Sequence, residues 1–374
     1  MKILHTVQRY YPDTGGSEEV VRQLSELLVS FGHEVVVATG RSCERKSKIL
    51  NGVRIEEFEC LGNTTEGIRG DAKTYRDFVA SANVDIMMNY AAQIWCSDLL
   101  FELLPTLPFK RVFVPCGFSR IDDPKFGAYF EHMPTVLRLY DAVVYLSPNY
   151  RDKHFANQHG LMNSVVIPNG AALDEFEQVT SGDFRSKFNL KDNFIVLNVS
   201  NHSTLKNHRF FWSCMQELSN DNTTSVLIGN SYFMGWRKWV SQCYLQCRLE
   251  ATRTKSLMLE GLTREDVVRA YVDADVFLFG SKVECSPLVM FESFASKTLF
   301  VTTDCGNVRD YSDVACVINS EAAAVDVVKD FRSHPQRYAD RIEKGYKLFQ
   351  ECLNWTSIAR TYESLYLKIL DRKV

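Results

Sequence analysis

The feature that most constrains the fold is a regular alternation of short apolar runs with segments of helical periodicity. Before position 168 the apolar runs predict six strands, at residues 2–7, 34–39, 53–58, 85–89, 110–115 and 142–147. Between the first two runs, apolar side chains recur at helical spacing over residues 18–30. Strands that alternate with helices form parallel sheets covered on both faces. The first part of the chain therefore predicts an α/β, Rossmann-like domain.

A break in this alternation lies at residues 165–170, where Pro168, Asn169 and Gly170 provide turn residues after an apolar run. The alternation then restarts, with strands expected at residues 194–199, 225–228, 255–259, 276–279, 299–302 and 315–318. We therefore predict a first domain over residues 1–168 and a second over residues 169–354. Two Rossmann-like domains facing each other leave a cleft between the carboxyl ends of their sheets, where such folds bind ligands.

Composition and charge exclude several classes of protein. The 374 residues are 45% hydrophobic and carry 43 basic against 46 acidic side chains. This is enough for full apolar cores, and it lacks the basic excess of a nucleic-acid binder. No apolar run approaches the ~20 residues of a membrane span, and residues 1–7 are too short for a secretory leader. We therefore expect a cytoplasmic protein, while peripheral contact with the inner face of a membrane stays open.

The eleven cysteines are scattered without Cys-x-x-Cys pairs, which is typical of a reducing compartment. Cys243 and Cys247 stand four apart on an apparent helix and are expected to be core positions. Trp236 and Trp239 continue the same helical spacing, so they are also expected in the core rather than at a nucleic-acid or membrane surface. The sequence predicts no metal site.

The segment most indicative of a binding site contains Glu284 and Glu292, which are separated by seven residues. Ser286 offers an N-cap hydroxyl, and Pro287 suits the first position of a helix. Glu284 is therefore expected in the loop before the helix, and Glu292 about one and a half turns into it. The alternative is a pair of acids that only stabilise a helix end through its dipole.

The start of this predicted helix also suits an anion. The first backbone N–H groups, near Leu288 and Val289, point in one direction and can hold a phosphate. Two carboxylates beside such a site can accept hydrogen bonds from sugar hydroxyls. The combination predicts a site for a nucleotide sugar.

Three other loops carry residues that suit a phosphate or a nucleotide. Gly15 and Gly16 lie between the first strand and the first helix, where glycines let the backbone approach a phosphate. Lys206 can reach a diphosphate as a mobile charge, and Gly261 can let a base lie flat on the backbone. Each loop also has a simpler interpretation. The Gly15–Gly16 segment could be an ordinary turn with Ser17 as N-cap, Lys206 could be a solvated lysine, and Gly261 could lie in a plain turn.

Two further loops are ambiguous from the sequence. Residues 304–306 follow a strand and are expected to turn the chain beneath the predicted nucleotide-sugar site. The alternative is a simple strand-to-loop turn. A basic cluster after the second strand is expected to be a solvated loop, with an anionic acceptor or lipid head groups as the alternative partners. Its members are Arg41, Arg45, Lys46 and Lys48.

Taken together, these segments resemble the retaining glycosyltransferases of the GT-B fold, family 4, also described as glycosyl transferases group 1. Any one segment is weak evidence for the resemblance, but together the segments match in order and spacing over most of the chain. They are Pro12…Gly15-Gly16…Glu18, Gly32-His33-Glu34-Val35, Ile167-Pro168-Asn169-Gly170, Lys206-Asn207, Leu227-Ile228-Gly229, Glu260-Gly261, Tyr271…Ala274-Asp275-Val276, Glu284…Glu292 and Trp355…Tyr362…Tyr366. The resemblance implies that the tail, residues 355–372, packs back on the first domain, which binds the acceptor, while the second domain binds the donor.

The resemblance also implies roles for individual residues. Glu292 would bind the ribose hydroxyls of the donor, and Glu284 would contact the transferred sugar. Lys206 would hold the diphosphate, which Gly16 would approach from the first domain. The implied catalytic residues are Glu284, Lys206 and His202. The implied donor-binding residues are Gly15, Gly16, Asn201, Lys206, Gly261, Ser286, Pro287, Leu288, Val289 and Glu292.

The implied reaction transfers a hexose from a UDP-, GDP- or ADP-sugar to a hydroxyl of a glycan or lipid-linked acceptor, in surface polysaccharide biosynthesis. Neither a metal nor a cofactor is expected, because side chains and dipoles neutralise the leaving diphosphate. The configuration at the anomeric carbon would be retained by front-face attack. The donor base and sugar, the acceptor with its linkage, and the oligomeric state are not legible. The acceptor is expected to be set by loops at residues 62–74 and 120–134.

The sequence departs from the family pattern at three places. Asn201 and His202 occupy the region where many members carry an arginine, and a protonated His202 could replace its charge. Cys116 stands where many members have a histidine. Cys285 to Pro287 replace a segment that usually contains a glycine. These departures keep two alternatives open: an epimerase or phosphorylase on the same fold, and a non-catalytic partner that binds sugar nucleotides.

Overall fold

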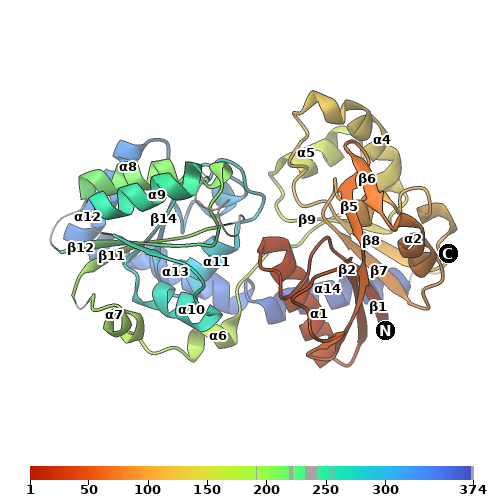
Figure 1. Ribbon diagram of the computed structural model, residues 1–374, viewed down its shortest axis with the longest axis horizontal. Coiled ribbons are helices and arrows are strands. Elements are labelled where there is room, and N and C mark those ends of the chain that lie inside the picture. Colours follow the sequence, from red (N-terminus) through yellow and green to blue (C-terminus); the bar gives the residue numbers. More distant parts are fainter. Residues whose placement is uncertain (191, 219–221, 232–241, 255, 372–374) are drawn as a thin grey trace. The chain divides into compact units, whose positions relative to one another are not determined.

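The chain folds into two compact units (Figure 1). In this computed structural model the described residues are 1–190, 192–218, 222–231, 242–254 and 256–371. Unit 1 comprises Met1–Asn169 and Trp355–Val374, and unit 2 comprises Gly170–Asn354. Each unit is an α/β domain built on its own sheet, so each is treated by itself below.

The sheet of unit 1 has eight strands in the order β10-β9-β8-β7-β1-β2-β4-β3. All neighbours in it pair in parallel except β3 and β4, which are antiparallel. A separate antiparallel pair is formed by β5 and β6. The strands are β1 Lys2–Thr6, β2 Glu34–Gly40, β3 Ile49–Leu50, β4 Val53–Phe58, β5 Cys60–Asn63, β6 Gly67–Gly70, β7 Ile86–Tyr90, β8 Lys110–Val114, β9 Ala142–Tyr145 and β10 Ser164–Val166.

Helices cover both faces of this sheet, as expected for parallel strands buried on both sides. They are α1 Gly16–Ser30, α2 Ala72–Ala80, α3 Trp95–Asp98, α4 Gly127–Arg138, α5 Arg151–Gln158 and α14 Trp355–Leu370, with short 3-10 helices η1 Leu104–Thr106 and η2 Pro124–Phe126. On one face the aromatic side chains of α2, α3 and α4 form the main core with Phe113 and Tyr145 from the sheet.

The last helix, α14, belongs to unit 1 although more than 180 residues separate it from the rest of that unit. Tyr362 and Tyr366 are fully buried, and the Tyr366 hydroxyl lies 3.4 Å from Nε2 of His5 on β1. Nε2 of His33, which follows α1, lies 2.8 Å from Oε1 of Glu363. An apolar stripe with polar ends therefore holds α14 against α1 and the sheet.

The sheet of unit 2 has six parallel strands in the order β13-β12-β11-β14-β15-β16. They are β11 Phe194–Val199, β12 Thr223–Ile228, β13 Leu257–Leu259, β14 Val276–Phe279, β15 Leu299–Thr303 and β16 Cys316–Ile318. Counted within the unit, the order is 3-2-1-4-5-6, the order of a doubly wound dinucleotide-binding sheet. In such sheets the strand order reverses between the first and fourth strands, here β11 and β14.

Two apolar clusters flank this sheet, one on each face. Helices α6 Leu173–Glu177, α7 Asp183–Lys187, α10 Arg264–Asp273, α11 Leu288–Ala295 and α13 Ala339–Glu351 contribute to the first. Helices α8 His208–Leu218, α9 Gln242–Arg253 and α12 Glu321–Ser333 form the second with the other strand face. The 3-10 helices are η3 Thr204–Lys206, η5 Val308–Tyr311 and η6 Pro335–Arg337. Within the first cluster Tyr271 stacks on Phe277 with ring centroids 5.2 Å apart.

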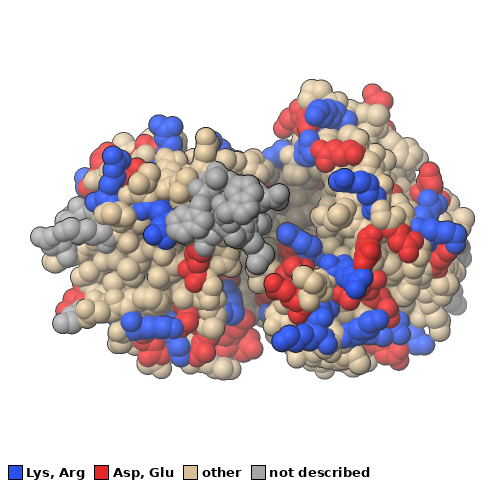
Figure 2. Space-filling model, in the orientation of Figure 1, with Lys and Arg blue, Asp and Glu red and all other residues tan. Residues whose placement is uncertain are grey.

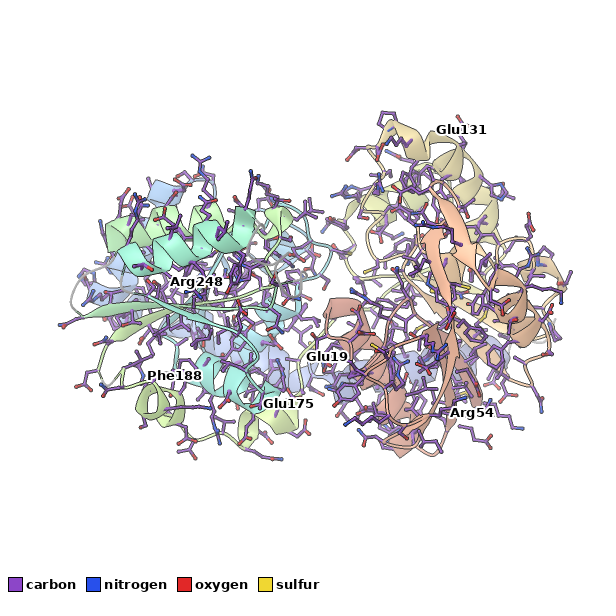
Figure 3. All side chains as sticks on the ribbon, in the orientation of Figure 1. Glu19, Arg54, Glu131, Glu175, Phe188 and Arg248 are labelled. Carbon is purple, nitrogen blue, oxygen red and sulfur yellow. The ribbon has the colours of Figure 1, made fainter. Side chains whose placement is uncertain are left out.

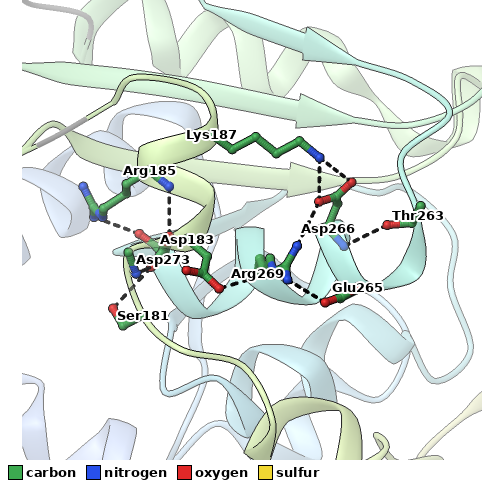
Figure 4. A network of polar contacts seen from close by, with 10 residues as sticks. Ser181, Asp183, Arg185, Lys187, Thr263, Glu265, Asp266, Arg269 and Asp273 are labelled. Atoms are coloured by element: carbon green, nitrogen blue, oxygen red, sulfur yellow. Dashed lines mark hydrogen bonds and ion pairs between the residues drawn. The ribbon is translucent and has the colours of Figure 1, made fainter.

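A polar network ties α7 to α10 at the edge of unit 2 (Figure 4). The Asp273 carboxylate accepts hydrogen bonds from Ser181 Oγ and from the backbone N–H of Arg185, at 3.2 and 2.9 Å. Lys187 Nζ lies 2.8 Å from the Asp266 carboxylate. Thr263 caps α10, because its hydroxyl accepts a hydrogen bond from the Asp266 N–H.

Most predicted strands are confirmed, and three at their expected bounds: β4, β11 and β14. The expected acceptor loops are wrong as loops. Residues 62–74 contain part of the β5–β6 pair and the start of α2, and residues 120–134 contain η2 and most of α4. Residues 62–74 are mainly polar and hide a strand pair, whereas residues 120–134 include Phe126, Phe130 and Met133, which are buried in the core of unit 1. Trp236 and Trp239 lie outside the described residues.

The basic cluster after β2 is partly buried, which corrects the expectation of a solvated loop. Arg41 is exposed, but the Arg45 side chain is 3% exposed. Arg45 pairs with Glu57 and donates to the carbonyl oxygens of Tyr10 and Tyr11, both at 2.8 Å. Arg45 therefore positions the loop that precedes Gly15, because the N–H groups of its guanidinium donate to backbone carbonyl oxygens of that loop.

Lys and Arg side chains intermingle with Asp and Glu over the face shown in Figure 2. Among the described residues on that face, no patch of one sign extends over either unit. None of the described helices combines the length and apolar character that crossing a bilayer demands.

Candidate functional site

The residues singled out in unit 2 gather at the carboxyl edge of its sheet. Lys206 ends η3, which follows β11, and Glu284 lies in the loop after β14. Lys206 Nζ is 2.6 Å from Glu284 Oε1, so the pair spans the point where the strand order reverses. Open α/β sheets bind ligands at this point, because loops from the two sides diverge there. The two side chains are 28% and 15% exposed, so both are partly desolvated.

Hydrogen bonds fix the loop that carries Glu284. Ser281 Oγ contacts Glu284 Oε1 at 2.7 Å and the Leu205 carbonyl oxygen at 3.1 Å. The Lys282 N–H donates to the same Leu205 carbonyl at 2.8 Å. The loops after β11 and β14 are therefore joined directly beside the Lys206–Glu284 pair.

Gly306, in the turn after β15, lies against the backbone of the Glu284 loop. Its φ is +61°, and a Cβ there would be 2.8 Å from the Cys285 carbonyl oxygen and 3.2 Å from Glu284 Cβ. Asn307 Nδ2 donates to Ser286 Oγ at 3.1 Å. Glycine is therefore required at 306 both for its left-handed conformation and for the close approach to residues 284–285.

We expect Gly306→Ala to destabilise unit 2 by about 1–3 kcal/mol more than Gly261→Ala does. Both glycines have a left-handed φ, +61° and +65°, but a Cβ at Gly261 meets no atom within 4 Å. The pair therefore separates the clash from the conformational strain, which is common to both. Urea unfolding followed by a probe in unit 2 measures the difference. Equal losses in the two variants would show that the backbone near Cys285 yields to the added methyl group.

Helix α11 begins one residue later than the sequence indicated. Pro287 is the N-cap residue, with φ −68° and ψ 122°, and Leu288 begins the helix. Ser286 is therefore not the N-cap. Among the described residues no side chain caps α11, so the backbone N–H groups of Leu288 and Val289 can serve an anion at this helix start.

Glu292 lies in the second turn of α11 and is 8% exposed. Its Oε1 is 2.6 Å from Nη1 of Arg264, the first residue of α10. Arg264 also contacts Glu175 of α6 through Nη2 at 2.7 Å; Glu175 is labelled in Figure 3. A buried carboxylate needs such a partner, because an unpaired one is costly. Arg264 is thus a site residue that the sequence analysis did not single out.

Three strand-end loops are linked through Asn230, which follows β12. Its backbone N–H donates to Asn201 Oδ1 at 3.1 Å, and its Oδ1 accepts from the Gly261 N–H at 3.0 Å. At Gly229 a Cβ would be 1.9 Å from the Ser200 carbonyl oxygen, so only glycine lets these loops approach. Asn201 and Gly261 therefore have fixed positions along the same sheet edge as Lys206.

His202 is buried at 3% exposure, and its ring lies edge-on to those of His208 and Tyr244. Its Nδ1 is 4.0 Å from Cys243 Sγ. Among the described residues these contacts, and none with Lys206 or Glu284, orient the ring. The structure thus places His202 with a buried cluster of thiol and imidazole groups.

In unit 1, Gly15 precedes α1 and Gly16 begins it, beside a buried acid, Glu18. The Glu18 carboxylate pairs with Arg9 at 2.7 Å and contacts Ser17 Oγ at 2.9 Å. A Cβ at Gly15 would be 2.4 Å from Glu18 Oε2, whereas a Cβ at Gly16 would meet nothing within 4 Å. Gly15 is therefore the N-cap residue that accommodates Glu18, and Ser17 is not the N-cap.

A second polar region of unit 1 lies at the ends of β7 and β8. Gln93 and Cys116 have φ values of +62° and +59°, a conformation that non-glycine residues seldom adopt outside functional or constrained sites. The Gln93 N–H donates to the Tyr129 hydroxyl, which in turn contacts Asp98 Oδ1, both at 2.9 Å. Burial raises the pKa of Asp98 to about 6. A sequence pattern cannot reveal these backbone angles.

The second unit matches a family model. Residues 181–348 match the model of glycosyl transferases group 1. Unit 2 is a glycosyl transferases group 1 domain. The chain is accordingly a glycosyltransferase, and the Lys206–Glu284 pair lies inside the matched segment.

Similar solved structures extend the likeness to the whole glycosyltransferase chain. Sucrose-phosphate synthase from Thermosynechococcus elongatus has a TM-score of 0.80 at 15% identity, with 100% of each chain covered. Anabaena HepE in complex with UDP and glucose has a TM-score of 0.78 at 14% identity, covering 98% of this chain and 100% of that one. These similarities establish the GT-B fold.

A curated relative covers nearly the same span. The phosphatidylinositol N-acetylglucosaminyltransferase GPI3 subunit of Saccharomyces cerevisiae (strain YJM789) is 17% identical over 96% of this chain and 81% of its own length. At this identity the relative is distant, and its printed activity describes that protein.

Proposed function

We propose that this glycosyltransferase moves a hexose from a nucleotide diphosphate sugar to a hydroxyl of a glycan or lipid-linked acceptor, with retention of configuration. The observation that carries the proposal is the Lys206–Glu284 pair, 2.6 Å apart, at the strand-order reversal of unit 2. Glu284 lies in the loop that leads into α11, and no described side chain caps the start of this helix. A cation, an acid and a helix N-terminus together suit a phosphorylated sugar.

The donor would bind through its diphosphate and its hydroxyls. The N–H groups of Leu288 and Val289 and the Lys206 ammonium would hold the diphosphate, while Glu292 would accept hydrogen bonds from the ribose. Arg264 pairs with Glu292 Oε1 and so orients that carboxylate. Gly261 would lie beneath the base, and Asn201 and Ser286 would hold the surrounding loops. The UDP bound to Anabaena HepE supports a nucleotide donor for this fold.

Transfer would break the bond between the anomeric carbon and the diphosphate oxygen and form a bond to the acceptor oxygen on the same face. The acceptor proton would pass to the departing phosphate oxygen. Negative charge grows on the diphosphate as it leaves, and Lys206 would stabilise it there. Glu284 would hold hydroxyls of the sugar that is transferred. These proposed roles of Lys206 and Glu284 require no metal in the transfer step. His202 is assigned no role in that step.

We assign acceptor binding to unit 1. Gln93 and Cys116 hold strained backbone at the carboxyl ends of β7 and β8, a place where ligands bind in parallel sheets. The lipid-linked alternative for the acceptor is supported by the GPI3 relative, whose printed name includes phosphatidylinositol. A role in surface polysaccharide synthesis at the cytoplasmic face of a membrane fits either acceptor.

A thermal-shift screen with UDP-, GDP- and ADP-sugars tests the donor assignment, because a ligand that binds the native state raises its melting temperature. We expect one base to give a clear shift. The shifted donor is then incubated with candidate acceptors, and NMR of the product determines the anomeric configuration. An epimer or a sugar phosphate as product would reassign the chemistry. Binding without donor consumption would identify a non-catalytic partner, and no shift at millimolar ligand would remove the proposal.

A further inference from the structure

Four metal-ligating side chains converge inside unit 2 on the β11 side of the Lys206–Glu284 pair. They are His202, His208, Cys243 and Cys247. One ligand atom from each lies within 4.8 Å of all the others, and every one except half-buried Cys243 is buried. We propose that these four side chains bind one zinc ion in a closed structural site.

The separations between ligand atoms suit a tetrahedral zinc ion. Bonds of about 2.3 Å to sulfur and 2.0–2.1 Å to nitrogen place neighbouring ligand atoms roughly 3.3–3.8 Å apart. His208 Nδ1 is 3.3 Å from Cys243 Sγ and 3.4 Å from Cys247 Sγ. His202 Nδ1 is 4.0 Å from Cys243 Sγ, which a small ring movement brings into range.

The order of ligands along the chain also suits zinc. The two histidines are separated by five residues, and the two cysteines by three, on one face of α9. Structural zinc sites commonly use pairs with two to four residues between cysteines and three to five between histidines. The cysteines alone are compatible with core positions, so only the approach of both histidines reveals the set.

Charge balance favours the divalent ion in this buried place. Two thiolates and two neutral imidazoles give zinc a set of ligands whose charge cancels that of the ion. Binding would release the two thiol protons to solvent. Four protein ligands leave no open position for water or substrate, so the site is structural rather than catalytic.

The hydrogen bonds around His208 prepare it as a ligand. Ser200 Oγ donates to Asn198 Oδ1 at 2.7 Å, so it accepts from His208 Nε2, 2.8 Å away. Asn198 is itself fixed by donating to the Leu278 carbonyl oxygen at 2.8 Å. With its proton on Nε2, the His208 ring presents the lone pair of Nδ1 to both cysteines. Metal-binding histidines usually have such a partner on their second nitrogen.

The His202 ring is only partly paired. Among the described residues, its buried Nε2 has no hydrogen-bond partner. Buried polar atoms are nearly always paired, because an unpaired one forfeits its hydration. Coordination through Nδ1 would hold this buried ring in place, while Nε2 would still lack a partner among the described residues.

The ion would join the loop after β11 to α9. That loop contains His202 and ends at Lys206, and Cys243 Sγ also contacts the Ser203 carbonyl oxygen at 3.6 Å. Zinc would therefore hold the backbone from which Lys206 reaches Glu284. The proposed zinc site does not depend on the proposed glycosyl transfer, because none of its four ligands is assigned to binding the nucleotide sugar.

Metal analysis of the reduced full-length protein, reconstituted with zinc and freed of excess, tests the proposal. We expect one zinc per chain, and a cobalt-substituted form with the ligand-field bands of tetrahedral thiolate coordination. Cys243→Ser and Cys247→Ser should lose the zinc. Cys214→Ser and Cys316→Ser, at buried cysteines of unit 2 outside the cluster, should retain it.

Wild-type protein keeps the test independent of whether a variant folds. A strong chelator should lower the melting temperature of unit 2, and added zinc should restore it. Wild-type protein that takes up no zinc, or whose melting temperature ignores chelator, would overturn the proposal. So would zinc retained by Cys243→Ser and Cys247→Ser, or a disulfide between these two cysteines in protein that was never exposed to oxidant.

Discussion

Replacing Lys206 by alanine is expected to lower kcat by about ten- to a thousandfold, the scale of losing one preorganised electrostatic donor. The ammonium is 2.6 Å from Glu284, and both lie at the strand-order reversal of unit 2. Without Lys206 the charge that grows on the leaving diphosphate loses its cation. Glu284 also becomes an unpaired negative group in the same loop. Steady-state assays with the donor found by the screen measure the effect.

Glu284→Ala is expected to give a loss in the same range, and the double variant less than the product of the two. Two groups in direct contact share their effect, because each single change also leaves the other unpaired. Lys282→Ala is the matched control, since it removes an exposed positive charge from the same loop. Near-normal turnover in both single variants, or losses that multiply fully, would remove the roles assigned to this pair.

Truncation after Asn354 is expected to unfold unit 1 and leave unit 2 folded. The deleted helix α14 buries several large apolar side chains, among them those of Ile358, Tyr362, Tyr366 and Ile369. At about 1.5–3 kcal/mol each, their burial contributes roughly 6–12 kcal/mol, comparable with the whole stability of a domain. The helix belongs to unit 1, and the core of unit 2 is built from residues 170–354.

Hydrogen exchange followed by mass spectrometry distinguishes the two units in the truncated protein. Amides of β1 and β7 should lose protection, whereas those of β11 and β14 should keep it. Removal of residues 372–374 alone is the control and should change neither unit. Protection that persists throughout β1 and β7 in the truncated protein would show that α14 is dispensable for the unit 1 core.

The alternation of apolar runs was sufficient to locate most strands, because the buried strands of a parallel sheet are continuous apolar segments. Phe194–Val199 and Val276–Phe279 have the expected bounds for this reason, whereas Val53–Phe58 contains exposed and half-buried charged side chains among its apolar ones. Helix boundaries that depend on backbone angles are harder to predict from the sequence. Ser286 was expected as the N-cap of α11, but Pro287 has the extended ψ of the capping position. Polar segments such as residues 62–74 concealed a strand pair, since its burial is slight.

The candidate site was only partly accessible from the sequence. Lys206 and Glu284 were singled out separately, and their contact depends on the pairing of β11 with β14 across 78 residues of chain. Arg264 was missed because nothing near it in sequence indicates Glu292 as its partner. Arg45 was expected in solvent, yet its donors satisfy carbonyl groups of the Tyr10–Tyr11 turn.

The sequence by itself determined the two α/β units, the order of their strands along the chain, and the two acids on either side of the helix start after β14. These features follow from local periodicity and turn chemistry, which act between residues close in sequence. The tertiary structure alone decided which side chains meet: Lys206 with Glu284, Glu292 with Arg264, and two histidines with two cysteines. Each of these contacts joins loops or helices that only sheet order brings together, so no local pattern encodes them.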